Sequence, residues 1–132
     1  MSVAVTQGVL VEVESSYVAE RSSPERGEYF FAYSVRVANS GSQTVKLVDR
    51  HWIITDGRGR VEEVRGPGVV GQQPVLRPGE SFQYTSGCPL HTPYGSMRGS
   101  YGMVRQDGTR FEAQIAEFEL AIPSQRRDRL PN

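Results

Sequence analysis

Residues 51–71 read HWIITDGRGRVEEVRGPGVVG, and this stretch decides the fold of the chain. It opens with alternating residues around Trp52, the single tryptophan. Asp56-Gly57 follows, a pair that tolerates the positive φ of tight hairpin turns. The stretch then ends in Gly66, Gly68 and Gly71, spaced as G-x-G-x-x-G. Two strands joined by a tight turn and followed by a glycine-rich connection indicate an all-β protein.

Period-two alternation of apolar residues recurs on both sides of this hairpin, and no segment shows a sustained 3.6-residue period. Within the last predicted strand the alternation shifts phase after Ile115, as a β-bulge produces. About seven short strands separated by turn signals predict an antiparallel β-sandwich of immunoglobulin or fibronectin type III shape. The predicted strands cover residues 8–19, 29–38, 45–55, a short segment around 61–64, and residues 81–86, 97–106 and 110–122.

This arrangement makes three structural predictions. Trp52 should lie buried between the sheets near Phe31 or Tyr33, because a large aromatic ring spans the gap between packed sheets. Loops 21–28, 56–59 and an irregular segment 87–96 should meet at one end, and loops 39–44, 66–80 and 106–109 at the other. Residues 1–122 should form one domain, and the charged tail 123–132 should be disordered.

The bulk composition limits the classes of partner. Lys+Arg and Asp+Glu both number 15, so the formal net charge is zero. A zero balance argues against a nucleic-acid or anionic-membrane binder, since both need excess cationic charge. Cys88 is the single cysteine, which fits a reducing compartment. Without a signal-peptide pattern or a long apolar run, we expect a cytoplasmic protein.

The central motifs resemble the ApaG family, and the likeness extends over residues 5–122. It rests on HWIITDGRG, on VRGPGVVGQQPVLRPGE, on FQYTSGCPLHTPYGSMRGSYGMV and on FEAQIAEFEL. The resemblance implies a small bacterial cytoplasmic protein with a fibronectin-type sandwich. It also implies a protein-binding role, since related domains occur in eukaryotic F-box proteins and a DNA-polymerase-interacting protein. In enteric bacteria the family is associated with cobalt tolerance and magnesium efflux.

The G-x-G-x-x-G motif suggests a dinucleotide site, but a Rossmann fingerprint requires a helix directly after the glycines. Pro74 and Pro78 oppose a helix here. A backbone nest could still bind a phosphate-bearing small molecule through the Gly66–Gly71 loop, helped by Arg65 or Arg77. The alternative is a glycine-shaped crossover between sheets. We expect this longest connection, with Arg65, Gly66, Gly68, Gly71 and Arg77, to be the recognition surface.

Three further residues are weak candidates for a divalent-cation site, namely His51, Cys88 and His91. Cys-x-x-His spacing suits zinc or cobalt, but a closed site needs about four ligands and no second cluster is present. Cys88 is followed by Pro89, so it gains no helix N-terminus to lower its thiol pKa. No serine lies in a nucleophile elbow. The sequence therefore predicts a non-enzymatic protein-interaction module without a cofactor, and as the alternative a regulator that binds a divalent cation or a small anion.

Overall fold

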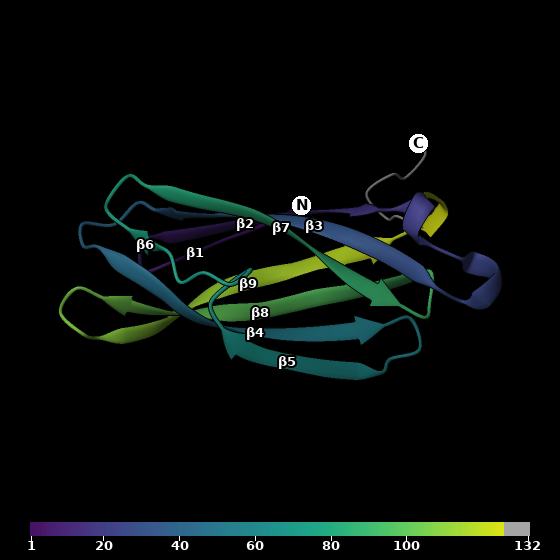
Figure 1. The fold of residues 1–132 in the computed structure, drawn as a ribbon. Helices are drawn as coiled ribbons and strands as arrows, with labels where there is room; N and C mark the ends of the chain where they lie inside the picture. The colour runs from purple at the N-terminus through teal and green to yellow at the C-terminus, as the bar shows by residue number, and fades with distance from the viewer. Residues whose placement is uncertain (126–132) are drawn as a thin grey trace.

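The structure is a computed structural model that describes residues 1–125, and within them it has nine strands in two layers (Figure 1). Three short 3₁₀ helices lie at Ala19–Arg21, Pro24–Arg26 and Pro123–Gln125. The strands are β1 (Ser2–Thr6), β2 (Val9–Tyr17), β3 (Tyr29–Asn39), β4 (Val45–Asp56), β5 (Val61–Pro67), β6 (Val75–Leu76), β7 (Ser81–Leu90), β8 (Tyr94–Arg105) and β9 (Arg110–Ala121).

The strands form two antiparallel sheets packed face to face, so the predicted β-sandwich is confirmed. The first sheet has the order β1-β2-β3-β7. The second has the order β5-β4-β8-β9, and β6 pairs with β4 on the same edge as β5. Every strand pairing is antiparallel, as the alternating sequence pattern requires of a sheet with one buried face.

The core confirms the placement of Trp52. Its side chain is 3% exposed. The ring lies 5.3 Å from Tyr33, 5.9 Å from Phe118 and 6.1 Å from Tyr101, in edge-on arrangements that aromatic pairs prefer. Phe31 is fully buried in the same cluster. The two inner faces of the sheets therefore meet around one tryptophan.

Bulges occur where the alternation changes phase. Met97 pairs with Phe118 and Gly99 with Ile115, so β9 has one extra residue between these pairs. This register shift confirms the predicted bulge. A second shift lies in β4 between Leu47 and Asp49. It changes which residues of β4 face the core from that point on.

Several sequence predictions need correction. The strand count rises to nine because β1 and β6 were not predicted. Residues 87–96 are not irregular: β7 runs to Leu90 and β8 begins at Tyr94. Pro89 is accommodated because β7 is an edge strand, where a missing N–H breaks no ladder. In the tail predicted to be disordered, residues 123–125 form a 3₁₀ turn, and residues 126–132 lie outside the described part.

The predicted grouping of loops at two ends is confirmed for most of them. At one end Gly57 N donates to Thr92 Oγ1 at 2.8 Å, and His91 Nδ1 lies 3.3 Å from the Gly27 carbonyl oxygen. At the other end Gln106 N donates to the Thr44 carbonyl at 3.0 Å. The 66–80 connection is the exception, because only its second half reaches that end.

The two long sides of the sandwich differ. On one side β1 and β2 pack against β9, and Gln114 N donates to Thr6 Oγ1 at 3.0 Å. We call this the closed side. On the other side the edge strands are β7 and β5, which belong to different sheets. We call this the open side, and the first half of the 66–80 connection lies along it. No helix within residues 1–125 is long and apolar enough to cross a membrane.

Candidate functional site

The glycine-rich connection leaves the second sheet in the middle of an edge rather than at an end. β5 stops at Pro67, which pairs with Asp49 near the centre of β4. The chain then follows β4, and Gly68 N donates to the Val48 carbonyl at 2.9 Å. The glycine motif and Cys88 consequently border the same open side. The prediction that they lie at opposite ends was wrong, because it treated the connection as a loop at a strand end.

A two-residue turn at residues 69–72 forms the tip of this connection. Val69 N donates to the Gln72 carbonyl and Gln72 N to the Val69 carbonyl, both at 2.8 Å. The two central residues, Val70 (φ 42°) and Gly71 (φ 79°), have the positive φ of a type I′ turn. Val69 is buried in the core at 1% exposure, whereas Val70 is 51% exposed.

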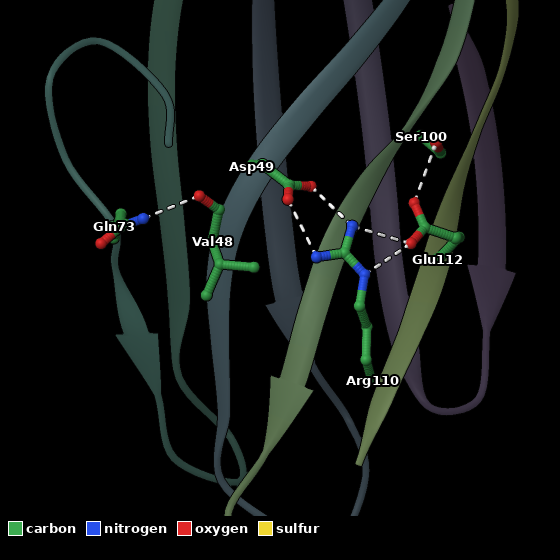
Figure 2. A network of polar contacts seen from close by, with 6 residues as sticks. All are labelled: Val48, Asp49, Gln73, Ser100, Arg110 and Glu112. Carbon is green, nitrogen blue, oxygen red and sulfur yellow. Dashed lines mark hydrogen bonds and ion pairs between the residues drawn. The ribbon is translucent and has the colours of Figure 1, made fainter. Parts of the chain in front are cut away.

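The glycines of the motif are explained by backbone shape. Gly68 has φ 58°, and a Cβ there would overlap the Gln72 carbonyl. Its amide and those of Val69 and Gln72 already donate to carbonyls within the protein. Gln73 Nε2 also donates to the Val48 carbonyl at 2.7 Å (Figure 2). The amides that a phosphate nest would use are therefore largely committed to the fold.

The predicted arginines do not point at the glycine loop, but a third one does. Arg65 is exposed and lies 3.5 Å from Glu63, and Arg77 donates to Glu80 beside the next turn. Arg50 instead donates through Nη1 to the Pro67 carbonyl at 2.8 Å and the Gly68 carbonyl at 2.9 Å. Sequence reasoning missed Arg50, although it lies two residues before Trp52 and so shares its inward face.

Arg50 lines a cleft between the sheets on the open side. Two adjoining cavities of about 200 and 300 Å³ share Tyr33, Arg50, Trp52 and Ser86 as lining residues. The turn at residues 69–71 borders the smaller cavity. The larger cavity lies between β5 and β7. It is lined in addition by Ile54, Glu62, Val64, Gly87, Cys88, Pro89 and Met97.

The tyrosine hydroxyls and the cysteine thiol in and beside this cleft stay protonated at neutral pH. Burial raises the pKa of Tyr33, Tyr84 and Tyr101, while the Arg50 charge opposes the rise at all three. The Tyr84 and Tyr101 hydroxyls are hydrogen-bonded to each other. Burial also raises the pKa of the Cys88 thiol to about 11, and the Glu62 carboxylate adds to the effect. The cleft therefore has one fixed cation, Arg50, one carboxylate, Glu62, and otherwise neutral hydroxyl and thiol groups.

Comparison with known proteins identifies the family. The ApaG domain profile matches residues 19–105. Protein ApaG of Methylobacterium sp. strain 4-46 is 56% identical over 124 residues, which cover 94% of this chain and 95% of the relative. The chain belongs to the ApaG family.

Solved structures agree with the ApaG fold described above. A crystal structure of a putative ApaA protein from Bordetella pertussis has 58% identity and a TM-score of 0.86, covering 87% of this chain and 94% of that one. A second X-ray structure, of a structural-genomics target, has 42% identity and a TM-score of 0.88 over 98% and 96% of the two chains. The ApaG resemblance expected from the sequence is thus confirmed for the family and the sandwich.

The weak metal candidates lie apart in this ApaG domain. His51 is on the outer face of β4, where Nε2 is 2.7 Å from Glu63 Oε1. That hydrogen bond is the main reason that the pKa of Glu63 is lowered. Cys88 faces the core from β7, and His91 lies in the β7–β8 turn. Among residues 1–125, no three His, Cys, Asp or Glu side chains come together to hold a metal ion.

A polar network on the outer face of the second sheet was also not predicted (Figure 2). Arg110 donates to both Asp49 oxygens at 2.9 Å and through Nε to Glu112 at 2.9 Å. These hydrogen bonds lower the pKa of Asp49 and raise that of Arg110. Gly102 of β8 lies beneath them and leaves room for Arg110 of β9 to reach β4. The network ties three strands together, and its arginine has most of its donors occupied.

Proposed function

We propose that this ApaG domain is a non-catalytic protein-binding module that recognises an apolar segment of a partner protein along its open side. The observation that carries the proposal is Val70. A β-branched residue with positive φ is unusual and costs about 1–2 kcal/mol relative to a relaxed backbone. Asn or Gly would fit the same turn without that cost, so a valine here supports a role for its exposed side chain in contact.

Other exposed valines extend the same surface. β5 and β6 pair in succession with one edge of β4, and the 68–74 segment joins them. Val61 on β5 is 62% exposed and Val75 on β6 is 56% exposed. Val61 and Val75 lie opposite Thr55 and Lys46 of β4, so with Val70 they are three separate exposed apolar residues spread along the open side. The exposed Arg65 and Glu63 supply charges between Val61 and Val70. Apolar contacts with a polar surround are typical of protein-binding surfaces.

The chemistry of the cleft supports a binding role over a catalytic one. A general acid or base works best with a pKa near the working pH, and a cysteine nucleophile requires a lowered pKa. Burial shifts the pKa of Cys88 and of the cleft tyrosines upward instead. These groups can donate hydrogen bonds, which suits recognition of a bound segment.

Site-specific photocrosslinking in cells tests the proposal. A photoreactive amino acid placed at Val61 or Val75 should yield a discrete protein adduct. The matched control is Val5, which is 64% exposed on β1 at the closed side. The adduct should weaken when Val70→Asn is added, because the polar side chain removes an apolar contact. The same adduct from position 5, or an adduct that Val70→Asn leaves unchanged, would contradict the proposal.

A further inference from the structure

We infer that the cleft on the open side binds a carboxylate group, with the guanidinium of Arg50 as its anchor. The inference goes beyond the proposed partner contact, because it concerns the space between the sheets and not the exposed valines. It would stand if the partner bound elsewhere.

Arg50 is held rigidly with donors to spare. Its Nη1 is occupied by the Pro67 and Gly68 carbonyls, and the guanidinium lies against Gly66, where a Cβ would meet it at 3.0–3.1 Å. Its Nε and Nη2 make no hydrogen bond within residues 1–125. Within the described residues, Ser2 Oγ is the buried side-chain atom without a hydrogen-bond partner. The unbonded Nε and Nη2 of Arg50 are therefore not fully buried and remain accessible. Nε and Nη2 form the edge of the guanidinium that binds two oxygens in parallel.

Arg50 also lacks a charge partner within the described chain. Arg36, Arg65, Arg77 and Arg110 each lie within 4 Å of a carboxylate oxygen, but Arg50 does not. It nevertheless faces the interior, in phase with Trp52. A partly buried cation without a counter-ion is unfavourable, and an anion entering the cleft would relieve that cost. The arginines of the exposed ion pairs already have a carboxylate partner, so an added anion would not stabilise them in this way.

The charge of the site favours a carboxylate over a phosphate. Arg50 is the single cation that lines both cavities. Glu62, at the entrance of the larger cavity, would repel a second negative charge. A planar group with two oxygens and one negative charge matches the free edge of one guanidinium. A polyphosphate would require further cations or free backbone amides, and the glycine loop has committed most of its amides.

The part of the ligand beyond its carboxylate would contact mostly apolar side chains of the cleft. Trp52, Ile54, Val64 and Met97 provide apolar walls, and the Ser86 hydroxyl lies on the opposite sheet. Combined apolar walls and few polar groups are typical of small-molecule sites. Because the cavities open to the side, the carboxylate can belong to a small aliphatic or aromatic acid or to the C-terminus of a peptide.

Nuclear magnetic resonance titration of the whole chain tests the inference. Benzoate should shift the Trp52 indole and the Val64 and Gly71 amide signals, and benzamide, its neutral isostere, should bind at least about tenfold more weakly. A second arm compares peptides that end in a free carboxylate with the same peptides amidated. Saturation by benzoate would identify a free acid as the source, and binding of the free-ended peptides alone would identify a C-terminus. Binding of neither, equal binding of benzamide, or tighter binding of inorganic phosphate would overturn the inference.

Variants assign the binding to Arg50. Arg50→Gln should weaken benzoate binding by about tenfold or more, whereas Arg65→Gln, an exposed control on the same edge, should leave it unchanged. Arg50→Gln also removes the bonds to Pro67 and Gly68, so its fold is checked by the Trp52 signal. Glu62→Gln leaves those bonds intact and should strengthen binding about twofold by removing repulsion. If Glu62→Gln weakens binding, or a folded Arg50→Gln binds normally, the assignment is wrong.

Discussion

Val70 and Gly68 show how single residues shape the open side. Gly68 is required by sterics, because its φ is positive and a Cβ would overlap the Gln72 carbonyl. Val70 also has a positive φ, yet nothing in the fold requires a valine there, since its side chain is half exposed. One position thus serves the backbone, whereas the other keeps an apolar group on the surface against a backbone preference.

Val70→Asn should raise the free energy of unfolding by about 1 kcal/mol, because Asn-Gly is the favoured pair for a type I′ turn and tolerates positive φ better than valine. Gly71→Ala at the neighbouring position should lower it by about 1 kcal/mol, since alanine is strained at φ 79°. Urea unfolding of both variants measures the two changes. A loss of stability in Val70→Asn would show that the valine is held by contacts that offset its strain.

At the scale of the elements, β8 is the strand in which glycines, with no side chain, are needed most for close packing. It is central in the second sheet, between β4 and β9. Gly99 pairs with Trp52, and a Cβ there would overlap the His51 carbonyl of the backbone. Gly102 pairs with Asp49, and the atoms nearest to a Cβ there would belong to the side chains of Asp49 and Arg110. The two glycines therefore differ in what would have to move.

Gly99→Ala should lower the free energy of unfolding by about 3 kcal/mol, because two paired strands must separate to admit the methyl group. Gly102→Ala should cost about 1 kcal/mol or less, since the Asp49–Arg110 pair is nearly half exposed and flexible side chains can move aside. Thermal and urea unfolding of the two variants provide the comparison. Equal losses would show that the ion pair of Figure 2 is as rigid as the backbone.

The sequence predicted the elements that have one buried face and missed those that do not. β3 alternates Phe31, Tyr33, Val35 and Val37 toward the core, so its pattern is unambiguous. β1 places Val3 and Val5 outward, and β6 has two residues, so neither shows the usual alternation. In the site, the turn glycines were predicted to shape a connection. Arg50 was missed because it is charged: its alternation with Trp52 and Ile54 places it on the inward face, but an arginine is ordinarily assigned to the surface.

At the scale of the whole molecule, the sandwich is fastened along one side. Ser15 Oγ donates to the Glu119 carbonyl at 2.6 Å, and Gln114 N donates to Thr6 Oγ1, so hydrogen bonds join the two sheets on the closed side. On the open side the cavities lie between β4 and β7, and the 68–74 segment covers part of the gap. A ligand or partner can therefore reach the space between the sheets from the open side without separating the core around Trp52.

Native-state hydrogen exchange should show this asymmetry. The β5 amides that bond to β4 are expected to exchange at least about tenfold faster than the β1 amides that bond to β2, although both strands lie at sheet edges. The reason is that β1 is covered by β9, whereas β5 borders the cleft and has largely exposed side chains. The central strands β3 and β8 should exchange only through global unfolding. If β5 matched β3 and β8, the open side would be as firmly held as the core, and entry of a ligand would require unfolding of the domain.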